Sequence, residues 1–185
     1  MKGVPGSVKL LLVLMGSGFF FGMQPAGAVD VTIKITGEIY IPPCVINNDT
    51  GIKVSFGEMS LYEVDGEKNA KTTSVNVTCD YYQGTPYIFV GGAQLSGAGD
   101  NVLKTTGANP STLGIALYQG GNVDTSHPLK IGQGEQGRYG YKITRGLAGQ
   151  NTASGTFMFT AVPYKHGELK AGTFSAIATM SISYL

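Results

Sequence analysis

The segment GTFSAIATMSISYL, Gly172 to Leu185, predicts a long β-strand at the C-terminal end of the chain. Side chains of a strand point alternately to its two faces, so every second residue shares one face. Here that face carries Phe174, Ala176, Ala178, Met180, Ile182 and Tyr184. A strand normally has a hydrogen-bonded neighbour on both sides or a protected edge. No sequence follows Leu185 to supply one, so the partner of this strand is the first question.

The first 28 residues have the pattern of a secretory signal peptide. Lys2 and Lys9 supply positive charge, an apolar run follows from Leu10 to Met23, and Ala26 to Ala28 form an A-x-A-type cleavage site. The run is short and glycine-rich for a membrane span, so an uncleaved anchor is the less favoured alternative. We therefore expect export, a mature chain beginning at Val29 and no stable membrane insertion.

The mature chain is almost electrically neutral. Lys2 and Lys9 belong to the signal, so 11 of the 13 basic residues remain against 12 acidic ones, and the formal charge is about −1. Such a balance gives no electrostatic reason to expect nucleic acid or an anionic membrane as a partner. The remaining 157 residues fit one domain.

The chain contains two cysteines, Cys44 and Cys79. In an exported protein an even number of cysteines favours a disulfide, which would stabilise a loop of this length by roughly 3–4 kcal/mol. A metal site is the alternative. It lacks ligands, because the two histidines, His127 and His166, are remote from both cysteines in sequence.

The sequence predicts β-strands along the whole mature chain. Alternating segments separated by glycine-rich turns favour an antiparallel sandwich, and no stretch of ten residues keeps a helical period. The predicted strands cover residues 29–35, 52–57, 73–79, 86–92, 113–119, 139–145, 155–164 and 173–184.

The N-terminal end of the mature chain alternates as well. The segment from Val29 to Ile41 places Val31, Ile33, Ile35, Gly37 and Ile39 on one face. Pro42 and Pro43 then interrupt any ladder before Cys44. We therefore expect this segment to be partly independent of the body and able to complete the sheet of another copy. The alternative is a complete sandwich in which both end strands pair within the chain.

The mature chain resembles, along its whole length, the minor pilins of Gram-negative chaperone–usher pili, and among these the tip adaptor subunits of P pili. The resemblance rests on GEIYIPPCVINN (Gly37 to Asn48), the two cysteines, GIALYQG (Gly114 to Gly120) and the C-terminal strand. In the family pattern a glycine is fourteenth from the C-terminus and a tyrosine is penultimate. Gly172 and Tyr184 hold these positions.

This resemblance implies an immunoglobulin-like sandwich that lacks its last strand. A periplasmic chaperone lends a strand to the open groove, and at an outer-membrane usher the N-terminal extension of an adjacent subunit replaces it. The donor residues would be Val31, Ile33, Ile35, Gly37 and Ile39. The groove edge that the chaperone recognises would comprise Gly172, Phe174, Ala176, Ala178, Met180, Ile182, Tyr184 and Leu185, with the Leu185 carboxylate held by basic chaperone residues.

The expected function is that of a structural minor pilin or tip adaptor, which links an adhesin to the pilus fibre at the cell surface and supports adhesion. The expected domains are a cleaved signal (1–28), a donor extension (29–41) and a pilin domain (42–185). We expect no enzymatic activity, cofactor or metal. The alternatives are a fibrillum or bulk pilin, and a single-domain carbohydrate-binding adhesin.

Three sequence patterns suggest a more specific function, which the surrounding sequence does not favour. GQGEQG, Gly132 to Gly137, matches a dinucleotide-binding motif but precedes a predicted strand where that motif needs a helix. His127 and His166 lie in predicted loops, and no G-x-S-x-G nucleophile motif occurs. A cluster of aromatic residues could stack on sugars, although packing within strands is the favoured reading. It comprises Tyr81, Tyr82, Tyr87 and Phe89.

Overall fold

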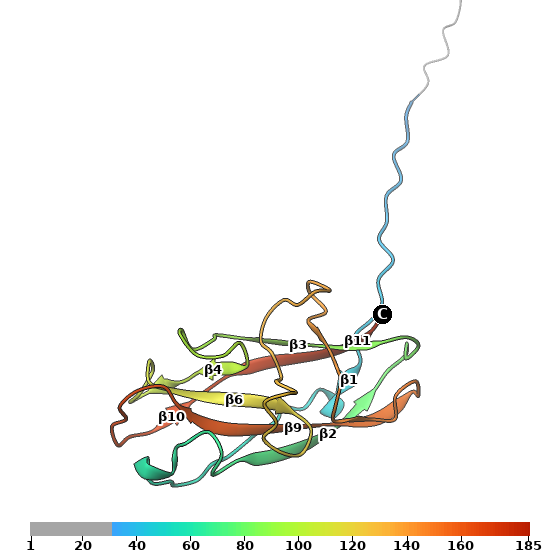
Figure 1. Cartoon of the computed structure of the whole chain (residues 1–185). Helices are drawn as coiled ribbons and strands as arrows, with labels where there is room; N and C mark the ends of the chain where they lie inside the picture. The colour runs from blue at the N-terminus through green and yellow to red at the C-terminus, as the bar shows by residue number, and fades with distance from the viewer. Residues whose placement is uncertain (1–30) are drawn as a thin grey trace, which may run out of the picture. The chain divides into compact units, whose positions relative to one another are not determined.

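The structure, a computed structural model, describes residues 31–185. They fall into two compact units, residues 31–38 and residues 39–185. The second unit is a two-layered antiparallel β-sandwich (Figure 1). The predicted signal peptide lies outside the described residues.

The larger sheet contains six antiparallel strands. In spatial order five of them are β1 (Val45–Ile46), β2 (Lys71–Thr78), β9 (Ser154–Lys165), β6 (Leu113–Gln119) and β4 (Val102–Lys104), and β8 (Leu147–Ala148) also pairs with β9. The long strand β9 carries Pro163, which has no backbone N–H to donate to a neighbour. It is tolerated because β2 ends its pairing at Ala161, so β9 has only β6 beside it at this point.

The smaller sheet consists of β11 (Ala178–Tyr184), β3 (Pro86–Gly92) and β7 (Tyr141–Lys142), in that order. A separate two-stranded ribbon joins β10 (Phe174–Ser175) to β5 (Thr106–Gly107). The C-terminal strand predicted from the sequence is therefore divided. Its first part pairs with β5 and its second with β3, and the exposed side chain of Ile177 marks the break.

Two short 3-10 helices complete the described elements: η1 (Asn47–Asp49) and η2 (Leu61–Glu63). The second helix begins at Ser60, whose hydroxyl accepts a hydrogen bond from the Tyr62 N–H while the Glu63 carboxylate accepts one from the Ser60 N–H. This capping box satisfies two donors that a helix start would leave unpaired.

The core lies between the two sheets. Alternate residues of β2 and β9 face residues of β3 and β11 across it. The most deeply buried of these side chains are Phe157, Ile88, Val90, Ile182 and Tyr184. Burying each large apolar side chain contributes about 1.5–3 kcal/mol, so each of these positions contributes appreciably to the stability of the sandwich.

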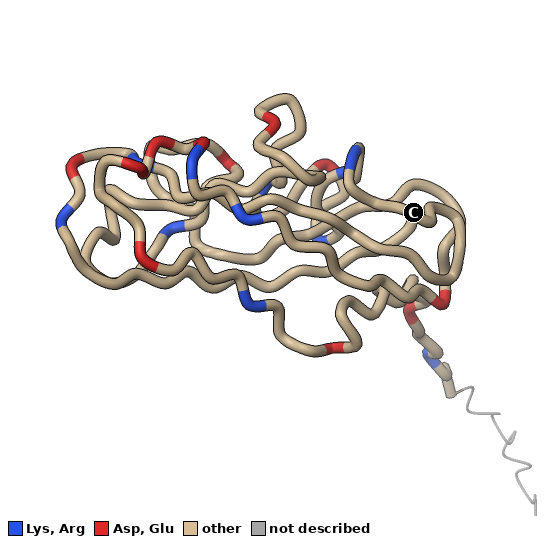
Figure 2. The backbone as a smooth tube through the Cα atoms, turned by 90° about the horizontal axis from the view of Figure 1, so that it is seen from below, with Lys and Arg blue, Asp and Glu red and all other residues tan. Residues whose placement is uncertain are grey.

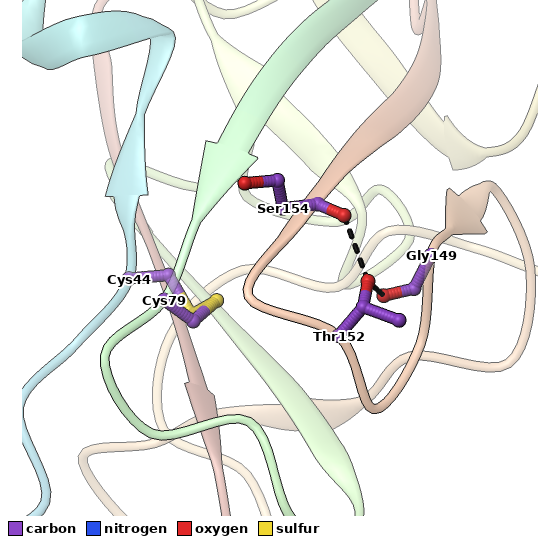
Figure 3. Close-up of a disulfide and its surroundings, with 5 residues drawn as sticks. All are labelled: Cys44, Cys79, Gly149, Thr152 and Ser154. Atoms are coloured by element: carbon purple, nitrogen blue, oxygen red, sulfur yellow. Dashed lines mark hydrogen bonds between the residues drawn. A yellow bond between two sulfur atoms is a disulfide. The ribbon is translucent and has the colours of Figure 1, made fainter.

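A disulfide joins Cys44 to Cys79, as the sequence predicted. Both residues are buried, and the Cys79 N–H donates to the Ala153 carbonyl over 2.9 Å. The turn that carries Ala153 is itself held by Thr152, whose hydroxyl oxygen lies 2.7 Å from the Gly149 carbonyl oxygen and 2.8 Å from that of Ser154 (Figure 3). The disulfide thus fastens the start of the sandwich to the end of β2.

Several strand predictions are confirmed. β3 and β6 have the predicted bounds, β9 is one residue longer at each end, and β2 overlaps the prediction over residues 73–78. The sequence did not predict four short strands, β1, β4, β5 and β8, because two or three residues are too few to show an alternation.

Three strand predictions are wrong or only partly right. Residues 52–57 are not a strand, because they have no ladder partner among the described residues. Residues 31–35 are also unpaired, and 29–30 lie outside the described residues. Of residues 139–145 only Tyr141–Lys142 form a strand. On one side Gly140 has a positive φ, and on the other the Thr144 and Arg145 N–H groups donate to the Gln119 side chain instead of to a strand.

Charged residues of both signs are interspersed along the described backbone (Figure 2). In the part of the chain that the structure describes, we find no helix long and apolar enough to cross a membrane.

Candidate functional site

One edge of β11 is almost unpaired. β3 covers the other edge along the full length of β11, from Ala178 to Tyr184. On the open edge the Cys44 N–H donates to the Ile182 carbonyl over 2.7 Å, and within residues 31–185 no other backbone group bonds to this edge. In an antiparallel strand the N–H and C=O of alternate residues point the same way. The backbone groups of Met180 and Ala178 therefore also point to the open edge, where they lack a strand partner.

A second extended segment lies across from this edge. Residues 51–57 read GIKVSFG, and their apolar side chains Ile52, Val54 and Phe56 are half-buried while the residues between them are exposed. This is the burial pattern of a strand without the hydrogen bonds of one. The segment runs antiparallel to β11, because the nearby Cys44 meets Ile182 while the Phe56 ring lies 6.2 Å from the Phe174 ring.

A groove of about 860 Å³ lies between these two walls. Its floor is formed by side chains from both sheets: Val90, Leu103, Ile115, Leu117, Phe159 and Ala161. Apolar surface left open in this way is costly in water, and a contiguous apolar recess commonly marks a binding site. Its two walls offer backbone groups and its floor offers apolar pockets, which is the combination that an added strand requires.

The groove has a closed end and an open length. At the closed end Ile182 and Tyr184 are 0% and 1% exposed, because they continue into the core beyond Cys44. Along the open length Phe174, Ala176 and Met180 are only half-buried, and Ala178 is exposed. Of the six alternating residues predicted to form the groove edge, four line the groove and two belong to the core. Those in the groove are Phe174, Ala176, Ala178 and Met180.

Gly172 lines the groove where the C-terminal segment enters it. Its φ is +153°, and a Cβ atom at this position would lie 2.5 Å from the Ala108 Cβ. Both the backbone conformation and the close approach require glycine.

Leu185, the last predicted edge residue, is held by β-type pairing to Thr85. The Thr85 N–H donates to the Leu185 oxygen over 2.7 Å, and the Leu185 N–H donates to the Thr85 carbonyl over 2.9 Å. Gly84 precedes this pair with a positive φ, and a Cβ there would collide with the Leu185 oxygen. The end of β11 is thus fixed in position.

The predicted donor residues lie in an extended segment without strand pairing. Val31, Ile33 and Ile35 are 78%, 80% and 89% exposed, and Ile39 is fully exposed. Gly37 has no atom within 4 Å of the position a Cβ would take. Large aliphatic side chains in this state have no apolar environment within the described residues, which is the condition expected of a segment that binds elsewhere.

The other candidates from the sequence lie away from the groove. Gly132 to Gly137 form a loop, closed by a bridge between Gly134 and Gly137, that leads to β7. No helix follows it, so the reading as a loop between strands is confirmed. His166 is exposed and stacks on Tyr164, and His127 binds the Asp124 carboxylate through Nδ1 over 2.9 Å. Across residues 31–185 no three His, Cys, Asp or Glu side chains gather as metal ligands.

The sequence predicted one wall of the groove and missed the other. The alternation of Ile52, Val54 and Phe56 was visible, but it predicted an ordinary strand. A sequence pattern does not show whether a predicted strand has a hydrogen-bonded neighbour. The two glycines at the ends of the segment, Gly51 and Gly57, were the available signal that the chain does not continue into a ladder.

Comparison with known proteins places this architecture in a family. A family model described as "Fimbrial protein" matches residues 33–185. The fimbrial adapter PapF of Escherichia coli is 41% identical over 157 residues, which cover 84% of this chain and 88% of PapF. The minor fimbrial protein PrsF of Escherichia coli matches with the same identity and the same coverage.

Solved structures agree with the sequence comparison. The P pilus adaptor subunit PapF superposes with a TM-score of 0.53 at 33% identity, covering 80% of this chain and all of that one. The P pilus rod subunit PapA superposes with a TM-score of 0.52 at 20% identity, covering 83% of this chain, and supports the fold alone. The sandwich with an open groove is thus the incomplete immunoglobulin-like fold of pilins, and the chain belongs to the fimbrial protein family.

Proposed function

We propose that this chain is a minor pilin of the adaptor type, which is assembled by donor-strand exchange and links an adhesin to the fibre of a chaperone–usher pilus. The observation that carries the proposal is the groove beside β11. It joins an unpaired strand edge at Ala178 and Met180 to an apolar floor, in a chain that also has an exposed alternating segment, Val31 to Ile39.

Inserting the donor segment into a groove is favoured by the burial of its apolar side chains. Burying Val31, Ile33, Ile35 and Ile39 in the groove of a neighbour would stabilise the assembly by about 6–12 kcal/mol before costs, at about 1.5–3 kcal/mol for each side chain. Ordering a flexible segment removes a large share of this. Gly37 fits a place where the inserted backbone passes close to the groove floor, because it has no side chain.

The same groove binds two kinds of partner in turn. Before assembly a periplasmic chaperone covers it with a lent strand and engages the edge from Gly172 to Leu185. At the outer-membrane usher the extension of an adjacent subunit replaces the chaperone. In turn, Val31 to Ile39 of this chain enter the groove of the other neighbouring subunit, which for an adaptor is the adhesin.

This function implies a definite domain arrangement and location. Residues 1–28 act as a cleaved export signal, 29–41 as the donor extension and 42–185 as the pilin domain. The chain passes through the periplasm to the fimbrium at the cell surface. Its work is structural, so we assign it no catalytic activity, in keeping with the family to which it belongs.

The adaptor role is favoured over the other pilin roles by the similarity to named relatives. PapF, named a fimbrial adapter, and PrsF are each 41% identical to this chain, whereas the fimbrial protein PrsE is 28% identical over 188 residues. A fibrillum or bulk pilin is therefore the second candidate. A single-domain carbohydrate-binding adhesin is the third, and the exposed donor-like segment counts against it.

The test is to produce the mature chain from Val29 to Leu185 in an oxidising periplasm, with and without a matched pilus chaperone. The proposal predicts a soluble one-to-one complex with the chaperone, and aggregation or loss of the chain without it. A stable, cooperatively folding monomer produced without any chaperone would overturn it, because the groove would then need no added strand.

A further inference from the structure

A second cleft lies at the edge of the sandwich, away from the groove. Its volume is about 230 Å³, and it lies between the segment 126–130 and strand β7, next to the loop 132–140. We name it the edge cleft and define it by Tyr87, His127, Lys130, Glu135, Tyr141 and Lys142. We propose that the edge cleft binds a single six-membered sugar ring that bears a carboxylate, such as a hexuronic acid.

The walls of the edge cleft are fixed by a buried glutamine. Gln119 is 4% exposed, and its side-chain oxygen accepts hydrogen bonds from the Thr144 N–H over 2.9 Å and the Arg145 N–H over 3.2 Å. Its side-chain nitrogen lies 3.4 Å from the Pro128 carbonyl oxygen, on the opposite wall. One side chain thus ties both walls together, and a site held in this way needs little reorganisation to bind a ligand.

The carboxylate of Asp124 fixes the wall that carries Ser126 and His127. It accepts hydrogen bonds from the Ser126 N–H over 3.0 Å, from His127 Nδ1 over 2.9 Å and from the Arg145 guanidinium. The bond from Ser126, and next those from His127, lower the pKa of Asp124 below its ordinary value. Asp124 therefore stays ionised and holds His127 in place beside the edge cleft.

Of the cations of the edge cleft, Lys142 is the one available to a ligand. Lys130 lies 3.0 Å from the Asp100 carboxylate and packs over the Tyr141 ring, and His127 is bound to Asp124. Lys142 is exposed, and among residues 31–185 it has no carboxylate partner. A single free ammonium group suits a ligand with one negative charge, because charge-assisted hydrogen bonds are among the stronger polar contacts.

The remaining chemistry of the edge cleft favours a sugar over a simple anion. Tyr87 lies directly opposite Lys142 in the β3–β7 pair, so its ring and the free ammonium group share one face of the sheet. The ring offers an apolar surface to the C–H face of a sugar. Glu135 supplies an acceptor for hydroxyl groups. A cleft of this size is smaller than most ligand pockets, which restricts the ligand to about one ring.

The experiment uses the mature chain in its chaperone complex, titrated with D-glucuronate and followed by NMR. D-glucose tests the need for the charge, and acetate tests the need for the ring. We expect saturable binding of glucuronate with changes at Tyr87 and Lys142, and weaker binding of glucose and acetate. Lys142→Gln should weaken glucuronate binding about tenfold, the loss expected for one charge-assisted hydrogen bond. The matched control Lys104→Gln, on β4 of the other sheet, should have no effect.

A pair of variants separates binding from folding. Tyr87→Phe keeps the ring and should retain affinity, whereas Tyr87→Ser should weaken both glucuronate and glucose. The proposal is overturned if glucuronate does not saturate, or if Lys142→Gln binds it as well as the parent chain does. It is also overturned if acetate binds as tightly as glucuronate, because the cleft would then recognise a carboxylate alone, such as an acidic side chain of a neighbouring protein. None of these outcomes bears on the groove, since all are measured in a complex that already has its added strand.

Discussion

The two halves of the C-terminal strand have the same alternating sequence and different surroundings. At the closed end Ile182 and Tyr184 are completely buried, because Cys44 and the disulfide bring β1 against that edge. Along the open length Ala178 and Met180 have the same backbone geometry and no neighbour on that side among the described residues. The difference shows that the strand is not intrinsically an edge. It becomes one where residues 31–185 do not supply the next strand.

Removing the closed end should have the largest effect. Deleting Ser183 to Leu185 removes the buried Tyr184 side chain and the pairing between Leu185 and Thr85. The loss of one large core aromatic alone costs about 3–5 kcal/mol. We expect no soluble chaperone complex, as measured by co-purification. A stable truncated chain would contradict the role given to the closed end.

A charge at the centre of the proposed donor segment should block assembly without affecting folding. Ile35→Asp would place an unpaired carboxylate in the groove of the next subunit, at a cost of several kcal/mol. We expect the variant to bind the chaperone normally but to fail to join the subunit whose groove should receive its donor segment. Lys34→Asp is the matched control, since adjacent residues of a strand face opposite sides. Equal incorporation of both variants would refute the donor assignment.

The two halves of the strand can be compared directly by substituting one residue in each. Ile182→Ala should destabilise the chaperone complex by about 2–5 kcal/mol in denaturant unfolding, because it leaves a cavity in the core. Met180→Ala should destabilise it less, since the side chain is only half-buried, but should speed the displacement of the chaperone by a donor-strand peptide. If the two variants have equal effects on both quantities, the division into closed end and open length is wrong.

The entry to the open length gives the smallest expected effect. Gly172→Ala places a side chain at a φ of +153° and in contact with Ala108, which should cost about 1–3 kcal/mol. Gly51→Ala, in the opposite wall, has open space around it and a φ outside the left-handed range, so it should change stability by less than about 0.5 kcal/mol. Thermal unfolding of the two chaperone complexes measures the difference.

The sequence predicted those parts of the fold that depend on local pattern. β3 and β6 have the predicted bounds because each is a run of strand-forming residues closed by turn residues. The cysteine pair bonds as expected. Ile182 and Tyr184 share one face with the groove residues, as the alternation indicated, but they lie in the core and not at the predicted groove edge.

The remaining features depend on which segments become neighbours. Residues 52–57 have the pattern of a strand and lack a partner, and the break at Ile177 arises because β10 and β11 pair with different strands. The sequence did not predict the edge cleft either, because tertiary contacts assemble it from residues 87, 119–130 and 135–144. A period of two identifies a strand and does not identify the strand beside it.

Amide hydrogen exchange along β11 tests most directly the claim that the groove receives a strand. In the structure the N–H groups of Thr179 and Ser181 point to β3, and those of Ala178 and Met180 point into the groove. In the chaperone complex we expect slow exchange at all four positions, with protection of Ala178 and Met180 maintained when a donor-strand peptide replaces the chaperone. Fast exchange at Ala178 and Met180 in a soluble, folded complex, with Thr179 and Ser181 still protected, would contradict it.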